Sequence, residues 1–383
     1  MQPSAPPSSA SLALRWKRRW IAARNRIIGD PRFRRWAARN PLIRPIARRK
    51  AGGLFDLVAG FTYTQTLLTA VESGLIELLA NGPAGAEEVA ARCGLSLPGA
   101  VLLLRASAAV ELAQQVAPDE WMLGQQGAAL QGNAGALAMI RHHRLLYADL
   151  ADPLALLRGD RRKATALSQF WTYAGAADPA AQDIRDGCET HAYSSLMASS
   201  QAMVAEQVLS AYSFDRHASL LDVGGGYGAF AQAVAAAYPA LRLGIFDLPD
   251  VLGRRAGAAS PGNTPALHPG DFFRDPIPTG YGCISLVRIL HDHDDAAVTI
   301  LLANIRESLE PGSALVIAEP MAGTRGAEKM GDAYFGLYLW AMRSGRPRRA
   351  EEIGAMLEAA GFRRWRRVGT DLPVITSLIV ATA

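Results

Sequence analysis

The stretch LLDVGGGYG at residues 220–228 decides the fold of this chain. Its first four residues are typical of a short buried strand, and the glycines allow a tight turn before an apolar helix that we predict over residues 230–238. A strand, a glycine-rich loop and a helix in this order open a doubly wound α/β sheet, in which the loop brings the backbone close to a ligand at the carboxyl edge. The sequence therefore predicts a ligand site beside these glycines.

The next predicted strand, residues 241–246, ends at Asp247. A carboxylate at this position can hold the two ribose hydroxyls of an adenosine cofactor. The run GGGYGA at 224–229 also satisfies the dinucleotide pattern GxGxxG/A, so the glycines alone leave a nicotinamide cofactor open.

Two further segments continue the alternation. GDFF at 270–273 follows a short third strand, which places Asp271 to bond an adenine amine and Phe272 to cover the ring. Residues 284–290 are predicted as a fourth strand that ends in HDHDD at 291–295. The polar residues thus gather where parallel strands end, which is where open α/β sheets bind their ligands.

Length and composition bound the class of protein. The 383 residues, 50% hydrophobic and 20% charged, provide ample core for two or three domains. No run reaches the ~18 apolar residues that span a bilayer. The three cysteines form no CxxC pair, which argues against a disulfide framework or a thiolate zinc site, and no secretory signal follows the basic start. We therefore expect a cytoplasmic protein.

Residues 1–50 are predicted to form a basic amphipathic N-terminal arm. Residues 11–50 hold fourteen Lys and Arg against one acid, Asp30, whereas the net charge of the whole chain is only +5. Apolar residues recur there at helical spacing: Leu12, Trp16, Trp20, Ala23 and Ile27. Such a helix favours peripheral contact with an anionic membrane surface, here the inner membrane. Packing on the protein itself, a dimer contact, nucleic acid and a transit sequence are the alternatives.

Residues 51–180 are predicted as a helical, winged-helix-like dimerisation domain. Residues 87–92 and 98–110 indicate a helix–turn–helix, and residues 121–123 a small wing hairpin. The second helix contains Arg105 as its only base, whereas a recognition helix needs several polar and basic side chains to read DNA. Dimerisation is therefore favoured, and no nucleic-acid partner is expected.

Five motifs in order carry a family resemblance: LDVGGGYG, IFDLPDV, GDFF, VRILHDHDD and LEPGSALVIAEP. Together they resemble the class I S-adenosylmethionine-dependent O-methyltransferases of the acetylserotonin and plant phenolic type. The resemblance covers residues 170–383 and, more loosely, 54–150. It implies a Rossmann-like methyltransferase domain over residues 181–383, S-adenosyl-L-methionine as the cofactor and a homodimer.

The resemblance also implies roles for single residues. The cofactor-binding positions correspond to Gly224, Asp247, Gly270, Asp271, Phe272 and Arg288. His291 corresponds to the general base and Glu319 to the acid that orients it. A histidine of ordinary pKa is neutral enough near pH 7 to accept a proton, and a neighbouring carboxylate fixes its tautomer.

Other charged residues near the motif are interpreted more plainly. Asp292, Asp294 and Asp295 are predicted to stabilise the N-terminus of a helix over residues 296–309, where negative charge is favourable. No metal is expected. Phenolic members of this family usually carry a second acid after the last long helix, and this chain has Pro347 in its place. We therefore expect one carboxylate beside the base rather than two. The remaining histidines are interpreted as surface or packing residues: His142, His143, His191, His217, His268 and His293.

Three local sequences refine the resemblance: residues 31–65, FWTYA at 170–174 and GDAYFGLYLWAMRSGRPR at 331–348. They resemble the hydroxyneurosporene (demethylspheroidene) O-methyltransferases of carotenoid synthesis, which implies a hydrophobic acceptor methylated at the tertiary C-1 hydroxyl of an acyclic hydroxy-carotenoid. Residues 332–343 would then line an elongated apolar tunnel. A phenolic or polyketide hydroxyl as acceptor, and a non-catalytic winged-helix binding protein with a vestigial cofactor fold, remain the alternatives.

Overall fold

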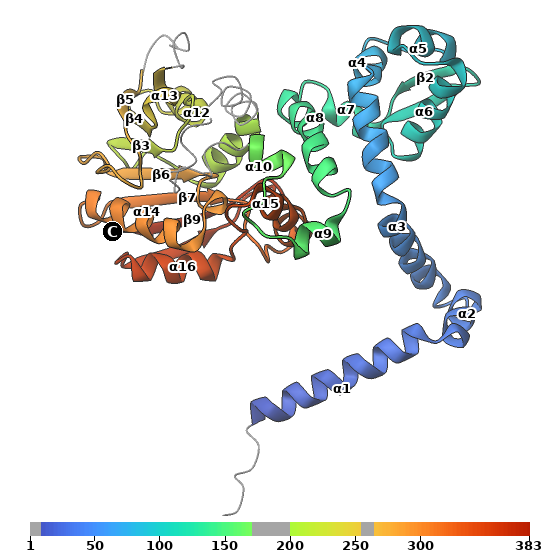
Figure 1. Ribbon diagram of the computed structural model, residues 1–383, viewed down its shortest axis with the longest axis horizontal. Helices are drawn as coiled ribbons and strands as arrows, with labels where there is room; N and C mark the ends of the chain where they lie inside the picture. Colours follow the sequence, from blue (N-terminus) through green and yellow to red (C-terminus); the bar gives the residue numbers. More distant parts are fainter. Residues whose placement is uncertain (1–8, 171–199, 254–263) are drawn as a thin grey trace, which may run out of the picture. The chain divides into compact units, whose positions relative to one another are not determined.

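The computed structural model describes residues 9–170, 200–253 and 264–383 (Figure 1). The chain divides into two compact units, Met1–Gly124 and Gln125–Ala383. The domain limit expected at residues 180 and 181 lies outside the described residues, as does His191. Helix α3 (Arg44–Glu72) runs across the limit expected at residue 50. Both domain limits therefore stay predictions.

The first unit is helical with one small hairpin. Its other elements are α1 (Ser9–Gly29), α2 (Pro31–Arg39), α4 (Leu75–Ala80), α5 (Ala86–Cys93), α6 (Leu97–Ala109), β1 (Ala113–Ala117) and β2 (Glu120–Leu123). Between α1 and α2, the Asp30 carboxylate accepts the N–H of Arg32 at 2.7 Å, and Pro31 occupies the first turn, where its missing N–H costs nothing. The predicted helix–turn–helix and hairpin are confirmed by α5, α6 and the antiparallel β1–β2 pair.

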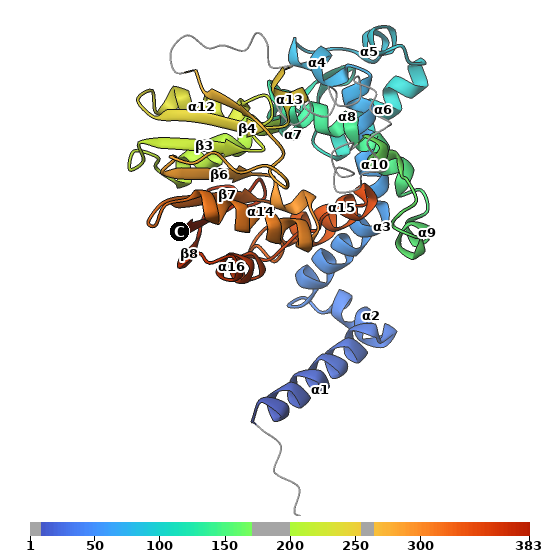
Figure 2. The same ribbon diagram turned by 60° about the vertical axis from the view of Figure 1, so that its left-hand side comes forward.

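The second unit is built on a seven-stranded sheet (Figure 2). Its strands are β3 (Ser219–Val223), β4 (Arg242–Asp247), β5 (Ala266–Pro269), β6 (Cys283–Val287), β7 (Ala314–Glu319), β8 (Arg364–Val368) and β9 (Ser377–Thr382). Their order is β5-β4-β3-β6-β7-β9-β8, with β9 antiparallel to both neighbours and the other pairs parallel. The chain moves outward from β3 to β5 and then returns to β6. This reversal makes the gap between β3 and β6 the topological switch point where such sheets bind ligands.

The helices of this unit cover both faces of the sheet or form a separate group. They are α7 (Gln125–Leu130), α8 (Ala134–Asp149), α9 (Pro153–Arg158), α10 (Ala166–Phe170), α12 (Ala229–Ala237), α13 (Pro249–Gly253), η3 (Leu290–Asp292), α14 (Asp295–Ser308), η4 (Lys329–Phe335), α15 (Gly336–Met342) and α16 (Ala350–Ala359). Neighbouring residues of β3, Leu220 and Leu221, point into different apolar clusters, as strand alternation requires. The Leu221 cluster includes α14 and α16, and the Leu220 cluster includes α12. Strands covered on both faces read as continuous apolar runs, which is why LLDV signals a central parallel strand.

A third apolar cluster joins α8, α9 and α10 to α15. It contains Leu146, Leu156 and Leu167 together with Leu339 and Met342 of α15, all buried. The aromatic residues of η4 and α15 therefore pack against α8, α9 and α10. Within residues 9–170, 200–253 and 264–383, no single helix is long and apolar enough to cross a bilayer; only α5 and α6 taken together, bent by 105°, meet that length and composition.

Candidate active site

The glycine loop after β3 has a backbone that only glycine adopts easily. Gly224, Gly226 and Gly228 have φ angles of +70°, +56° and +83°. A Cβ on Gly224 would lie 2.5 Å from the Ile289 Cδ1, whereas one on Gly226 would meet nothing within 4 Å. The loop therefore packs tightly at Gly224 and opens at Gly226.

Asp247, the last residue of β4, reaches this loop. Its Oδ2 accepts the N–H of Gly226 and its Oδ1 the N–H of Leu248, both at 2.7 Å. Burial raises the pKa of Asp247 to about 6, although the two backbone bonds oppose that rise. The structure thus brings the predicted ribose acid against the glycine loop at the switch point.

A second carboxylate, Asp222 of β3, lies beneath the same loop. Its Oδ1 accepts the Ser285 hydroxyl at 2.7 Å, and the two residues face each other in the β3–β6 register. Its Oδ2 has no hydrogen-bond partner among the described residues and lies 2.6 Å from where a Cβ of Gly225 would stand. Burial raises the pKa of Asp222 to about 7. Sequence reasoning missed this buried acid, although it stands within the glycine motif.

The predicted adenine contacts converge on the loop from the side of β5. Gly270 donates its N–H to the Asp247 carbonyl at 3.0 Å. The Phe272 ring lies 3.6 Å from where a Cβ on Gly224 would stand, so this ring borders the glycine loop. Asp271 accepts the N–H of Phe273 at 2.9 Å and so shapes its own turn. An open glycine loop, an unsatisfied buried carboxylate oxygen and a bordering aromatic ring suit an adenosine group that carries a cationic tail.

Arg288 follows β6 in a strained conformation, with a φ of +60°. Its N–H donates to the Ala318 carbonyl at 2.8 Å, and its Nη1 donates to the Ser200 hydroxyl at 2.7 Å. This guanidinium is therefore held at the carboxyl end of the strand that precedes His291. Its predicted contact with the cofactor stays a prediction.

His291 is held by Glu319, the last residue of β7. The Glu319 Oε2 lies 2.5 Å from His291 Nδ1, and the Oε1 accepts the N–H groups of Ile289 and Leu290 at 2.9 and 2.7 Å. One carboxylate thus satisfies the first amides of η3 and fixes the imidazole orientation. Both side chains are almost fully buried. The structure brings the predicted base and its predicted orienting acid into direct contact.

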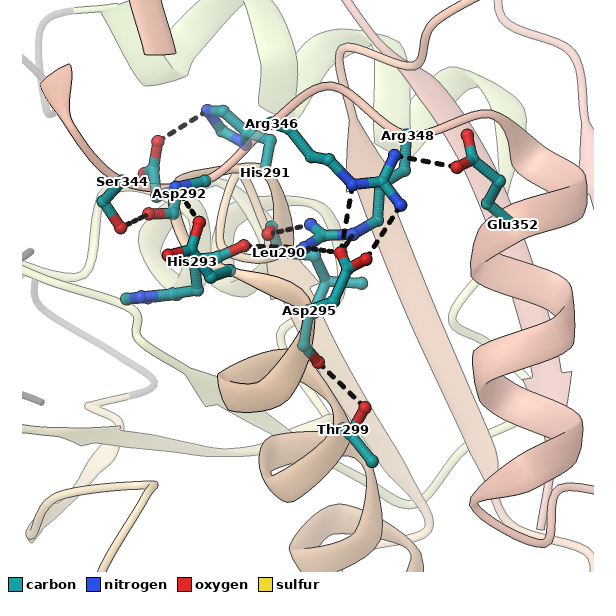
Figure 3. Close-up of polar contacts among 12 residues, drawn as sticks. Leu290, His291, Asp292, His293, Asp295, Thr299, Ser344, Arg346, Arg348 and Glu352 are labelled. Atoms are coloured by element: carbon teal, nitrogen blue, oxygen red, sulfur yellow. Dashed lines mark hydrogen bonds and ion pairs between the residues drawn. The ribbon is translucent and has the colours of Figure 1, made fainter. Parts of the chain in front are cut away.

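Asp292 supplies a second carboxylate to the same imidazole (Figure 3). Its Oδ1 lies 3.0 Å from His291 Nε2, and its side chain is buried. The expectation of a single carboxylate was therefore wrong, as was the helix-terminus role for Asp292. The cause is the short turn η3, which turns Asp292 back onto His291 and delays α14 until Asp295, with Asp294 as its N-cap residue.

The charges shift the titration of this pair. Burial lowers the pKa of His291, but Asp292 and Glu319 outweigh it, so the net pKa is raised. Burial raises the pKa of Asp292 to about 6, although His291 opposes that rise. Nδ1 of His291 therefore faces the Glu319 carboxylate, and Nε2 faces the Asp292 carboxylate. The expectation of an ordinary histidine pKa was therefore wrong.

A buried arginine holds the turn that carries the base (Figure 3). Arg348 donates to the Leu290 carbonyl at 2.6 Å, to the His293 carbonyl at 2.7 Å and to the Asp295 carboxylate at 2.7 Å. Its side chain is only 1% exposed. Arg348 directly follows Pro347, the residue predicted to stand in place of a second acid. This segment therefore contributes a cation to the turn at residues 290–295. No local sequence pattern indicated this role.

Aromatic residues of η4 and α15 lie against the base. The Phe335 ring meets the His291 ring edge-on at 5.5 Å between centroids. His142 and His143 are packed against this segment, and they bond the Tyr338 and Tyr334 hydroxyls, each at 2.8 Å. Of the residues predicted to line an acceptor tunnel, Tyr338, Leu339 and Met342 are buried in the apolar helical cluster, and Tyr334 and Phe335 are partly buried against it; the tunnel stays a prediction.

The other histidines are mostly packed. His293 lies between Phe272 and Phe273, with ring centroids at 5.7 and 5.0 Å, and burial lowers its pKa to about 4. His217 and His268 bond tyrosine hydroxyls away from this site. In the described parts of the chain, no group of three or more His, Cys, Asp or Glu could hold a metal ion.

Comparison with known proteins identifies the family and the fold. Residues 147–363 match the family model of an O-methyltransferase domain, and residues 55–126 that of an O-methyltransferase dimerisation domain, which supports a homodimer. The demethylspheroidene O-methyltransferase of Rhodobacter capsulatus is 42% identical over 90% of this chain and 85% of its own length. That of Cereibacter sphaeroides is 39% identical over 93% of each. The crystal structure of human N-acetylserotonin methyltransferase in complex with SAM shares the fold, with a TM-score of 0.73, 23% identity and coverage of 87% of this chain and 97% of that one.

Proposed function

Because the chain belongs to the S-adenosylmethionine-dependent O-methyltransferase family, we propose that it methylates the tertiary C-1 hydroxyl of an acyclic hydroxy-carotenoid, with His291 as the general base. The observation that carries the mechanism is the buried contact of His291 with Glu319 and Asp292 beside the switch point. The acceptor class rests on the two demethylspheroidene O-methyltransferases that resemble this chain over most of its length.

Residues at the carboxyl edge would hold the cofactor. The Gly226 loop would receive its polar tail, Asp247 its ribose hydroxyls and Phe272 one side of its adenine, while the free Oδ2 of Asp222 offers a buried acceptor for a cationic group. When bound, S-adenosylmethionine supplies a methyl group on a sulfonium, whose neutral thioether is a good leaving group. The protein adds alignment, for which fixed geometry provides up to about 7–11 kcal/mol.

His291 would take the acceptor proton at Nε2. Glu319 keeps a proton on Nδ1, so the nitrogen that faces Asp292 is the one that can exchange protons. The neutral imidazole accepts the hydroxyl proton at Nε2, and the imidazolium formed in this way is stabilised by both carboxylates. Asp292 therefore raises the proton affinity of the base, together with Glu319.

The base assignment is tested by His291→Gln and by Asp294→Asn as a matched control. Asp294 stands three residues away and accepts the N–H of Gly345 at 3.0 Å rather than contacting the imidazole. We expect His291→Gln to lower kcat at least about a hundredfold, with cofactor affinity by calorimetry nearly unchanged and the control near wild type. Retained turnover in His291→Gln would reject the base.

We further propose that the basic arm docks on an anionic membrane, where a carotenoid resides. On α1, Trp16 and Trp20 are 70% and 63% exposed, and Arg19 and Arg24 lie over their rings at 5.9 and 5.2 Å. Exposed tryptophans among arginines suit an interface between headgroups and acyl chains, where each basic residue adds about 1 kcal/mol of attraction.

Removing residues 1–43 leaves α3 intact from its first residue. We expect this deletion to lose co-sedimentation with vesicles that contain anionic lipid, whereas neither form should bind neutral vesicles. The double variant Trp16→Ala and Trp20→Ala keeps the charge of the arm. It therefore separates insertion of the tryptophan rings into the membrane from electrostatic attraction to anionic lipid. Equal binding of the full chain and the deletion to anionic vesicles would reject the docking role of the arm.

A further inference from the structure

Two histidine–tyrosine pairs connect α8 to the segment that contacts the base. His142 Nε2 lies 2.8 Å from the Tyr338 hydroxyl, and His143 Nε2 lies 2.8 Å from the Tyr334 hydroxyl. Both histidines are consecutive on α8, and both tyrosines stand one helical turn apart on η4 and α15. Helix α8 therefore holds the phenol rings of η4 and α15 in place through two hydrogen bonds.

The fixed rings continue to the base through Phe335. The Tyr334 and Tyr338 ring centroids lie 4.9 and 6.2 Å from that of Phe335, and Phe335 meets His291 at 5.5 Å. The result is a continuous aromatic strip from the base to α8. The strip passes through η4, a seven-residue π-helix, and π-helical turns occur frequently at functional sites.

The strip is uncharged near neutral pH. Burial lowers the pKa of His142 to about 4 and also lowers the pKa of His143. Burial raises the pKa of Tyr334 to about 12 and raises that of Tyr338 further. Each tyrosine hydroxyl is already bonded to a histidine, so the strip offers ring surface rather than free hydrogen-bonding groups.

We infer that His142 and His143 are positioning residues for acceptor selection: His143 fixes Tyr334, and His142 fixes the buried Tyr338 behind it, so that the partly buried rings of Tyr334 and Phe335 lie along an elongated apolar acceptor whose hydroxyl reaches His291. This inference rests on the proposed function. The rings supply apolar contact along the chain of the acceptor, and the pairs prevent the phenols from turning their hydroxyls into that contact. A short acceptor that reaches only the base would gain nothing from the strip.

The test compares His143→Leu, which removes the bond to Tyr334 at similar volume, with His143→Gln, whose amide can still bond the hydroxyl. The matched control is His217→Leu, which breaks the 2.7 Å bond from His217 to the Tyr212 hydroxyl in the apolar cluster around Leu220. Each variant is assayed with a 1-hydroxy-carotenoid in detergent micelles and with a short tertiary alcohol. Cofactor affinity by calorimetry and the melting temperature are measured alongside.

For His143→Leu we expect the KM for the carotenoid to rise about tenfold, the size of one buried hydrogen bond. We expect kcat, the cofactor dissociation constant and the rate with the short alcohol to stay within about twofold of wild type. His143→Gln should restore most of the KM, and His217→Leu should lower the melting temperature without changing the KM.

An unchanged carotenoid KM in His143→Leu would overturn the inference while leaving the proposed function intact. Equal losses with the long and the short acceptor would also overturn it, because they indicate a general structural defect. If the wild-type protein methylates no carotenoid at all, the proposed function fails and the inference fails with it.

Discussion

Replacing Asp292 by Asn should make His291 easier to deprotonate and a weaker base. The Asp292 Oδ1 lies 3.0 Å from His291 Nε2. At an effective dielectric constant of about 20, two unit charges at that distance attract by about 5 kcal/mol. The gain is smaller than this limit because burial raises the pKa of Asp292 to about 6, so the carboxyl is itself partly protonated near that pH.

The sign of the effect follows from the charges. Asp292 and Glu319 raise the pKa of His291 against the effect of burial, so removing one anion lowers that pKa. Activity requires the neutral imidazole, and the acid limb of the pH profile of kcat/KM should therefore move to lower pH by at least about one unit. The plateau at high pH should fall by roughly ten- to a hundredfold, because the imidazolium formed during transfer loses a counter-charge.

The assay follows transfer of labelled methyl groups across pH 5 to about 9, a span that brackets the unperturbed histidine pKa. Asp294→Asn is the control, since it removes an equal charge in the same segment without touching the imidazole. An acid limb that stays in place in Asp292→Asn, or that moves to higher pH, would refute the idea that Asp292 holds the proton on His291.

Three further changes test the remaining parts of the site. Gly224→Ala would place a Cβ 2.5 Å from the Ile289 Cδ1 at a φ of +70°, so we expect cofactor affinity by calorimetry to fall at least about tenfold; unchanged affinity would contradict the packing argument. The pKa of Asp247 is raised to about 6, so protonation below that pH should weaken cofactor binding, and Asp247→Asn should remove this pH dependence. Arg348→Met should remove the bonds to the Leu290 and His293 carbonyls and leave the Asp295 carboxylate to Arg346 alone; we expect kcat to fall about tenfold or more and the melting temperature to drop by several degrees, whereas a full kcat would show that the turn holds without the cation.

The strands and helices around the proposed cofactor site could be predicted because local sequence determines them. The apolar runs that became β3 and β4 are covered on both faces, and three of the four glycines between β3 and α12 adopt left-handed angles that few other residues accept. The fourth strand was predicted too long. It ends at Val287, because Arg288 turns left-handed and residues 290–292 close into a short helical turn on Glu319.

The site was predicted only where a motif names its residues. His291 and Glu319 were identified by resemblance, and their contact needs the neighbouring ends of β6 and β7. Asp292 was misassigned because a carboxylate before a helix usually serves that helix, and only the three-dimensional turn brings it back to the imidazole. Arg348 acts over more than fifty residues of sequence separation, so no local pattern could reveal it.

The aromatic strip shows the same limit. The histidines of α8 and the tyrosines of η4 and α15 stand more than 190 residues apart in the chain. Each looks like an ordinary packing residue within its own segment. Their pairing depends on the apolar cluster that joins these helices, which is a property of tertiary packing.

The most direct test of the proposed activity offers the purified protein methyl-labelled S-adenosylmethionine and two separate acceptor pools. One pool is a 1-hydroxy-carotenoid in detergent micelles, and the other is a set of simple phenols, with His291→Gln as the blank. We expect label in the carotenoid alone and none with the blank. Label in a phenol but not in the carotenoid would contradict the proposed acceptor, and equal label with His291→Gln would contradict the proposed base.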